Sequence, residues 1–196
     1  MAEKVTDAAL DTLFRKARSY GAFASELVSD AQLHAIYDIM KHGSTTANSQ
    51  PQRIVFLRSQ EAKDRLAPAL SKANLSKTLA APVVAIFAYD LKFSEHLDRF
   101  YHVPGAKNWY TTTPQLNEQT AFRNASLQAA YFMIAARALG LDCGPMSGFD
   151  NAKVDAAFFA GTRIRSNFLV NLGHGDRASI FPRSPRLGFD EACRIA

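Results

Sequence analysis

Small polar and cationic side chains occur in short segments of this chain, close to the points where helices and strands are expected to end. Guanidinium, ammonium, amide and hydroxyl groups of this kind can bind an anionic small molecule. Each group also has an ordinary structural interpretation, as a helix-terminal cation, a turn or a solvated loop. The segments are Arg18-Ser19-Tyr20, the 44–50 loop with Thr45, Thr46 and Asn48, Asn74 with Lys77, Pro145-Met146-Ser147-Gly148, and Arg183 with Arg186.

Several familiar catalytic and nucleotide-binding motifs are absent from the sequence. Gly173-His174-Gly175 follows an expected strand but has no third glycine, which argues against a Rossmann dinucleotide site. No Walker A motif occurs, and Ser147 lacks the context of a hydrolase nucleophile. The five histidines form no HxH or HxxxH pair and the two cysteines form no CxxC, so we expect no metal site.

Composition indicates one globular domain over residues 1–196, with 47% hydrophobic and 21% charged residues. The net charge of +5 comes from scattered Lys and Arg, which favours anionic small molecules over nucleic acid as partners. No apolar run reaches the roughly 18 residues that span a bilayer, and the first residues lack the apolar core of a signal peptide. With only Cys143 and Cys193, we expect a cytoplasmic protein without a membrane partner.

Apolar spacing predicts the helices that would position the polar segments. A helix is expected over residues 6–19, so that Arg18-Ser19-Tyr20 lies at its end. The capping box that begins at Ser29 predicts a second helix, which Gly43 closes. Residues 114–139 are apolar nearly all round and predict a long, central, buried helix that stops at Gly140. Further helices are expected at 60–70, 74–80, 91–101 and 150–159, the last with Asp150 as its cap, and a loop is expected at 102–114.

Four apolar segments have the length of strands: 53–58, 82–89, 141–146 and 166–173. The second, with the sequence PVVAIFAY, is continuously apolar, as is typical of a strand that is buried on both faces. Helices and short strands alternate irregularly, and helix outweighs strand. We therefore expect an α+β or mixed α/β fold.

Taken together and in this order, these segments resemble the nitroreductase-like flavin oxidoreductases. Within them the chain resembles the malonic semialdehyde reductases of the Rut pyrimidine-degradation pathway. The resemblance extends over essentially the whole chain. It is carried by Ala17-Arg18, STTANSQP at 44–51, PQL at 114–116 with TAFRN at 120–124, RALGLD at 137–142 and GPMSGFD at 144–150.

The resemblance implies an α+β fold with a central, mainly antiparallel mixed sheet and a long buried helix. It implies an intertwined homodimer that holds two FMN molecules at its interface. Arg18 would bind the FMN phosphate beside Ser19 and Tyr20, and Arg183 and Arg186 would complete the phosphate site. Asn74 and Lys77 would reach the pyrimidine edge of the ring, and Met146, Ser147 and Gly148 would lie near its N5 and O4. Thr45, Thr46 and Asn48 would cover the ring from the partner subunit.

Elementary chemistry agrees with these implied roles. The FMN phosphate is a dianion, which suits arginine pairs such as Arg18 with Arg186. Reduced flavin carries negative charge at N1 and O2, so that Lys77 would favour the reduced state. Asn74 can both donate and accept hydrogen bonds at a ring edge, and Gly148 allows a close backbone approach.

The resemblance implies a ping-pong reaction in which NADH or NADPH reduces the flavin, after which a second substrate takes the hydride. For malonic semialdehyde the product is 3-hydroxypropionate, with water as the default proton donor. Arg99 and Arg123 could bind the substrate carboxylate, or could be ordinary surface arginines. Two alternatives remain open: a broad nitro- or quinone-reductase, and a flavin-binding module without turnover.

Overall fold

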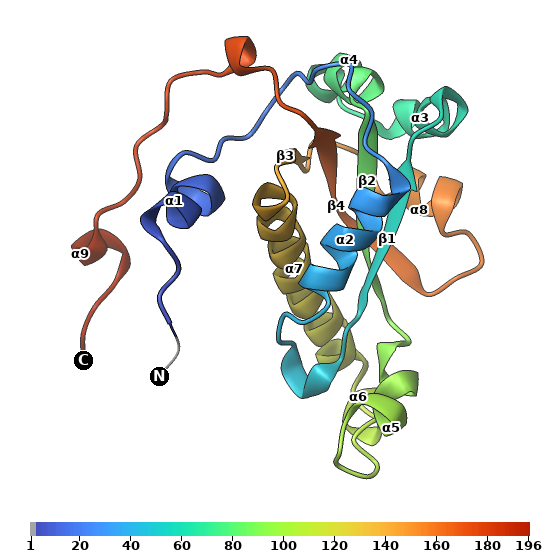
Figure 1. Ribbon diagram of the computed structural model, residues 1–196. Helices are drawn as coiled ribbons and strands as arrows, with labels where there is room; N and C mark the ends of the chain where they lie inside the picture. The colour runs from blue at the N-terminus through green and yellow to red at the C-terminus, as the bar shows by residue number, and fades with distance from the viewer. Residues whose placement is uncertain (1–2) are drawn as a thin grey trace.

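The computed structural model describes residues 3–196 and is built around a four-stranded sheet (Figure 1). The strands are β1 (Gln52–Leu57), β2 (Val83–Asp90), β3 (Asp142–Met146) and β4 (Ile164–Gly173). The α-helices are α1 (Asp7–Leu10), α2 (Asp30–Met40), α3 (Gln60–Leu66), α4 (Lys72–Ala80), α5 (Leu97–Phe100), α6 (Asn108–Thr111), α7 (Pro114–Ala138), α8 (Asn151–Phe158) and α9 (Phe189–Ala192). Short π or 3-10 turns are η1 (Asp11–Arg15), η2 (Thr46–Asn48), η3 (Ala67–Ala69), η4 (Phe93–His96) and η5 (Arg177–Ser179).

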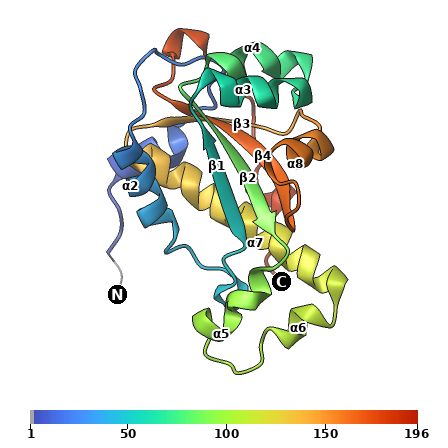
Figure 2. The same cartoon turned by 90° about the vertical axis from the view of Figure 1, so that its right-hand side faces the viewer.

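The strands lie in the order β1-β2-β4-β3, and each neighbouring pair is antiparallel. Residues 83–88 of β2 are fully buried, as the continuous apolar run predicts. Successive side chains of β2 point to opposite faces of the sheet and pack into different hydrophobic clusters. Val83, Ala85 and Phe87 pack with α2 and α7, whereas Val84 and Ile86 pack with residues of α3 and α8. Figure 2 looks onto the sheet and shows the strands crossing in front of α7, and Figure 1 shows α7 and α8 on opposite sides of the sheet.

Local chemistry fixes the ends of several elements where the sequence predicts them. The Ser29 hydroxyl accepts from the N–H of Gln32, and the Gln32 side chain accepts from the N–H of Ser29, so the predicted capping box is present. The Asp150 side chain likewise accepts from the N–H of Lys153 and begins α8. Gly140, with φ of 79°, stops α7 one residue after its C-cap Leu139.

Several structural expectations need correction. The segment 102–114, expected to be a loop, contains the short helix α6. The first helical segment ends at Arg15 in a π turn, so Arg18 and Ser19 lie in extended chain after it. The sheet is antiparallel throughout its strand pairs, and its parallel component is a single bridge between Ser19 and Cys143. The long helix α7 is buried on one side only, because Leu116, Phe122 and Leu127 on its other side are 42–49% exposed.

The N-terminal segment and the C-terminal tail, residues 181–196, lie on the same side of the sheet in Figure 1, although Figure 2 shows the two ends of the described chain well apart. The tail carries α9, and its first residues contact the segment after α1, because Arg183 donates to the carbonyls of Arg15 and Ala17. Large apolar side chains of this tail are strongly exposed: Phe181 by 84%, Leu187 by 70%, Phe189 by 62% and Ile195 by 87%. In the part of the chain that the structure describes, no helix combines the length and apolar character needed to cross a membrane.

Candidate functional site

The segment that carries Arg18 lies along the outer edge of β3. Ser19 forms a parallel bridge with Cys143, and the N–H of Tyr20 donates to the Cys143 carbonyl at 3.1 Å. A Cβ atom on Gly144 would collide with the carbonyl oxygen of Tyr20, so this close crossing requires glycine. The extended segment therefore places Arg18 next to the beginning of β3.

Arg18 meets the start of the C-terminal tail. Its guanidinium donates to the carbonyl of Phe181. From the tail, Arg183 donates to the carbonyls of Arg15 and Ala17 at 2.8 and 2.9 Å. Two guanidinium groups thus lie on the same short stretch of backbone, which concentrates positive charge there.

Arg186 and Tyr20 are placed differently from this pair. Arg186 donates to the carbonyls of Ser184 and Pro185 within its own tail, so a single chain does not pair it with Arg18. The Tyr20 side chain is buried against Gly175, and burial raises its phenolic pKa. Its ring therefore packs the Arg18 segment onto the sheet, whereas the Ser19 side chain beside it is exposed.

Helix α4 is attached to the turn that follows β3. The side-chain amide of Asn74 and the N–H of Ser71 both donate to the Gly148 carbonyl, at 2.9 and 3.0 Å. The Thr78 hydroxyl donates to the sulfur of Met146 at 3.3 Å. These contacts join Asn74 and Thr78 of α4 to Met146 and Gly148, with Ser147 and Gly148 exposed. Lys77 precedes Thr78 on the same helix.

A strand asparagine links α4 to the Arg18 side of β3. Asn171 is fully buried in β4, where it pairs with Gly144, and its amide donates to the Lys77 carbonyl at 3.2 Å. Gly144 in turn touches Tyr20. A series of contacts therefore joins α4 to the segment that carries Arg18, across the end of the sheet. It runs from Lys77 through Asn171 and Gly144 to Tyr20.

The 44–50 loop lies at the opposite end of the sheet. It leads into β1, and the N–H of Asp90, the last residue of β2, donates to the Pro51 carbonyl at 2.9 Å. Helix α4, by contrast, precedes the first residue of β2. Eight strand residues span roughly 23 Å. Thr45, Thr46 and Asn48 are thus separated from Asn74 and Lys77 within one chain.

A cavity adjoins this loop and not the turn around Gly148. It has a volume of about 790 Å³ and lies between α2, β1 and α5. Cations dominate its charged lining, since Arg53, Arg58 and Arg99 face it with a single acid, Asp30. Arg58 and Asp30 form an ion pair there.

Comparison with known proteins identifies the arrangement. The model of the nitroreductase family matches residues 14–174. The chain belongs to the nitroreductase family. It is 59% identical over 191 residues to a Burkholderia lata protein named "Putative NADH dehydrogenase/NAD(P)H nitroreductase", covering 97% of this chain and 98% of that one. A Xanthomonas oryzae protein with the same name is 58% identical over 195 residues and covers all of both chains.

A solved structure shares the fold of this nitroreductase-family chain. It is the crystal structure of a nitroreductase-type protein from Exiguobacterium sibiricum in complex with FMN, with a TM-score of 0.86 and 20% identity over the full length of both chains. At this identity the likeness establishes the fold alone.

Two buried residues that hold α4 in place were missed from the sequence. Lys63 of α3 is buried and donates to the carbonyls of Leu79 and Ala81, at 3.3 and 2.7 Å, so that it caps the end of α4. Burial lowers its pKa. Asn171 is the other. An asparagine inside the apolar run FLVNLG was a usable signal for it, whereas nothing local distinguishes Lys63 from a surface lysine.

Proposed function

We propose that this chain is an FMN-dependent oxidoreductase that uses NADH or NADPH. The observation that carries the proposal is the series of contacts that joins the Arg18 segment, through Gly144 and Asn171, to α4 and so to the Ser147-Gly148 turn. The FMN and NAD(P)H expected from the sequence agree with the family, with the names of the relatives and with the FMN-bound neighbour. When bound, FMN would accept a hydride from NAD(P)H and pass it to a second substrate.

The residues present fit this cofactor. Arg18 and Arg183 offer guanidinium donors to a phosphate dianion at one end of the cluster. Lys77 offers a cation for the edge of the ring that becomes negative on reduction. The side-chain amide nitrogen of Asn74 is committed to Gly148, which leaves its oxygen as an acceptor for a ring N–H. Ser147 and Gly148 present exposed backbone to a planar ligand.

A homodimer would complete the site. The 44–50 loop cannot reach the cluster around Gly148 in its own chain, but the equivalent loop of a second copy could cover it. Exposed apolar side chains on α7 and the C-terminal tail offer an extensive surface for such a contact. Two copies that exchange their tails and loops would bury this surface and form two equivalent sites.

The substrate we favour is malonic semialdehyde, a short aldehyde acid, with 3-hydroxypropionate as the product. Its carboxylate would bind a cationic side chain. Both candidates, Arg99 and Arg123, lie close to residues that contact the 44–50 loop. Arg99 stacks 4.8 Å over the Phe100 ring, and the Phe100 carbonyl accepts from the Asn48 amide. Arg123 is exposed on α7 beside Asn124, which accepts from the N–H of Thr46. A loop that covers the partner's flavin would bring these arginines to the same site.

The relatives' names favour a second candidate, a reductase of nitro compounds or quinones. Visible spectra of the purified protein, before and after NADH, test the shared flavin chemistry, because bleaching of flavin bands is expected in either case. NADH oxidation with malonic semialdehyde, nitrofurazone and menadione then separates the two. Turnover of only the nitro compound or the quinone would exclude the aldehyde acid. A colourless protein that gains no flavin from added FMN would exclude both.

A further inference from the structure

The 44–50 loop has an unusual backbone. Ala47, Asn48 and Gln50 have φ values of 51°, 50° and 42°, in the left-handed region that residues with a Cβ atom disfavour. Such conformations persist only where the surroundings enforce them, and they concentrate at functional segments. Three of them within four residues require specific contacts that hold the loop.

Contacts inside the loop and to neighbouring helices supply part of this restraint. The N–H of Thr46 donates to the buried Asn124 side chain at 2.8 Å. Asn48 donates to the Phe100 carbonyl at 3.1 Å and accepts from the Gln50 side chain at 3.0 Å. Both ends of the Asn48 amide are therefore engaged in holding the loop, which the sequence did not indicate.

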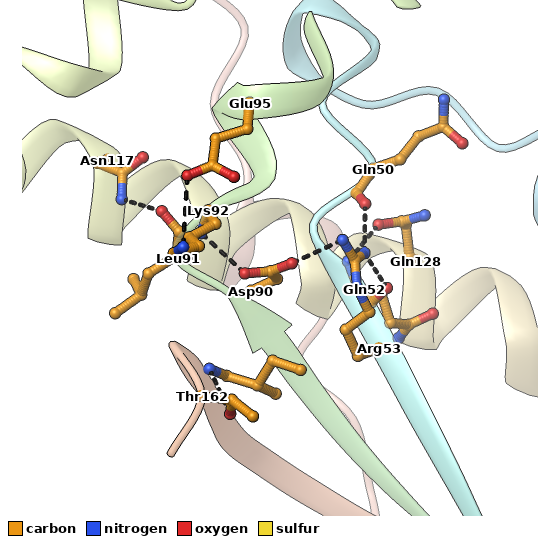
Figure 3. A network of polar contacts seen from close by, with 11 residues as sticks. Gln50, Gln52, Arg53, Asp90, Leu91, Lys92, Glu95, Asn117, Gln128 and Thr162 are labelled. Atoms are coloured by element: carbon orange, nitrogen blue, oxygen red, sulfur yellow. Dashed lines mark hydrogen bonds and ion pairs between the residues drawn. The ribbon is translucent and has the colours of Figure 1, made fainter. Parts of the chain in front are cut away.

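Arg53 supplies the remaining restraint at the point where the loop enters β1. Its guanidinium donates to the carbonyls of Gln50 and Gln52, at 3.2 and 2.9 Å, and to the Asp90 carboxylate at 2.7 Å (Figure 3). The second Asp90 oxygen accepts from the N–H of Lys92 at 2.8 Å. The Asp90 side chain is only 13% exposed, which strengthens the ion pair relative to a surface pair.

We propose that Arg53, held by Asp90, is a positioning residue that fixes the left-handed end of the 44–50 loop before any ligand binds. The role of the loop in this inference rests on the proposed function, in which the loop covers the flavin of the partner subunit. The planar guanidinium reaches two carbonyls and a carboxylate at once. A lysine would keep the charge but could not reproduce this fork.

Hydrogen exchange in the ligand-free protein tests the positioning directly. Arg53→Gln and Asp90→Asn are expected to speed exchange of the Thr46 and Gln50 amides by about tenfold or more, because the loop opens more often. Arg53→Lys should give an intermediate rate. Lys92→Gln is the matched control: it removes a neighbouring exposed cation that bonds none of the loop carbonyls, and it should leave both amides unchanged.

A second measurement links the loop to binding. In the same variants the dissociation constant for FMN should rise about tenfold, with partial rescue by Arg53→Lys, while sedimentation shows an unchanged oligomer. Unchanged amide exchange in both Arg53→Gln and Asp90→Asn would overturn the proposal, and so would an equal effect of Lys92→Gln. Were Arg53→Gln to unfold, Asp90→Asn and Arg53→Lys still decide the point. A wild-type protein that binds no FMN would refute the proposed function, while the exchange rates would still decide the role of Arg53.

Discussion

The Asn74 side-chain amide donates to the Gly148 carbonyl at 2.9 Å, across the gap between α4 and the turn after β3. The N–H of Ser71 reinforces the same carbonyl at 3.0 Å. Because two donors from one helix hold one carbonyl, the helix and the turn keep a fixed relative position. Lys77 lies about one turn further along α4, where its carbonyl accepts from the Asn171 amide at 3.2 Å.

Gly148→Ala should disturb this contact. The new Cβ would lie 2.7 Å from the Asn74 amide nitrogen and 3.0 Å from the Ser71 hydroxyl, so the amide must leave the carbonyl. Loss of the bond should cost roughly 1 kcal/mol of stability and weaken FMN binding. Thermal unfolding and flavin titration measure the two effects. Gly21→Ala is the control, because nothing lies within 4 Å of its Cβ position. Equal behaviour of the two variants would show that Gly148 has no special role.

Arg18→Ala should lower FMN affinity by about 30-fold, the equivalent of roughly 2 kcal/mol for a charge-assisted hydrogen bond to phosphate. Arg15→Ala is the matched control, because the exposed Arg15 side chain pairs with Asp7 at 2.9 Å. Fluorescence titration of FMN into the ligand-free variants provides the measurement. The phosphate role of Arg18 is wrong if both variants bind FMN like the wild type.

The protein should lose stability at alkaline pH. Burial raises the pKa of the Cys143 thiol to about 12, and also raises the phenolic pKa of Tyr20, Tyr89 and Tyr110. A raised pKa means that the folded state holds its proton longer. The stabilisation is thus complete below the unfolded pKa and disappears as pH rises through the folded one. For Cys143 this window runs from about 9 to 12, with a slope of about 1.4 kcal/mol per pH unit.

Thermal midpoints between pH 8 and 11 measure this effect. Lys63 acts in the opposite direction, because burial lowers its pKa and the unfolded chain holds the extra proton. A midpoint that stays level or rises over this range would contradict the prediction. In a Cys193→Ser variant, which retains only Cys143, a thiol reagent at pH 8 should react only after unfolding.

Removal of residues 181–196 should convert the proposed dimer into monomers at micromolar concentration, because the tail carries strongly exposed apolar side chains. Sedimentation velocity gives the result, and flavin retention should fall with it. Leu27→Ser replaces a side chain that is 76% exposed outside the tail, and it should leave the oligomer unchanged. A truncated chain that sediments like the wild type would place the contact elsewhere.

Local patterns were sufficient for many elements of this fold. Capping at Ser29 and Asp150 and the apolar run of β2 depend on neighbours in sequence, and the structure confirms them. The end of the first helix depended instead on tertiary contacts, because Arg18 to Tyr20 leave the helix to pair with β3. The apolar outer side of α7 could not be distinguished from a buried one, because periodicity reports apolar character and not what covers it.

For the candidate site as well, some features could be predicted from the sequence and others depended on tertiary contacts. The resemblance implied that Asn74, Lys77 and Gly148 bind the cofactor. The structure joins Asn74 to Gly148 by a hydrogen bond and places Lys77 on the same helix as Asn74, and the roles of all three toward FMN stay predictions. The sequence could not show which arginine of the tail lies near Arg18, because this depends on the path of the tail. Arg183 contacts the backbone of Arg15 and Ala17, whereas Arg186 contacts only its own tail. The role of Lys63 could not be predicted from the sequence, because the carbonyls it donates to, those of Leu79 and Ala81, lie 16 and 18 residues away.

The distance between the 44–50 loop and α4 also has a consequence for mixed assemblies. If each site takes its loop from one chain and Arg18 from the other, two differently inactivated mutants can complement each other. A hybrid of an Arg18→Ala chain with a loop-deficient chain would carry both defects in one site and neither in the other. Co-expression of the two impaired chains would then give hybrids with one intact site, and with it more turnover than either chain alone.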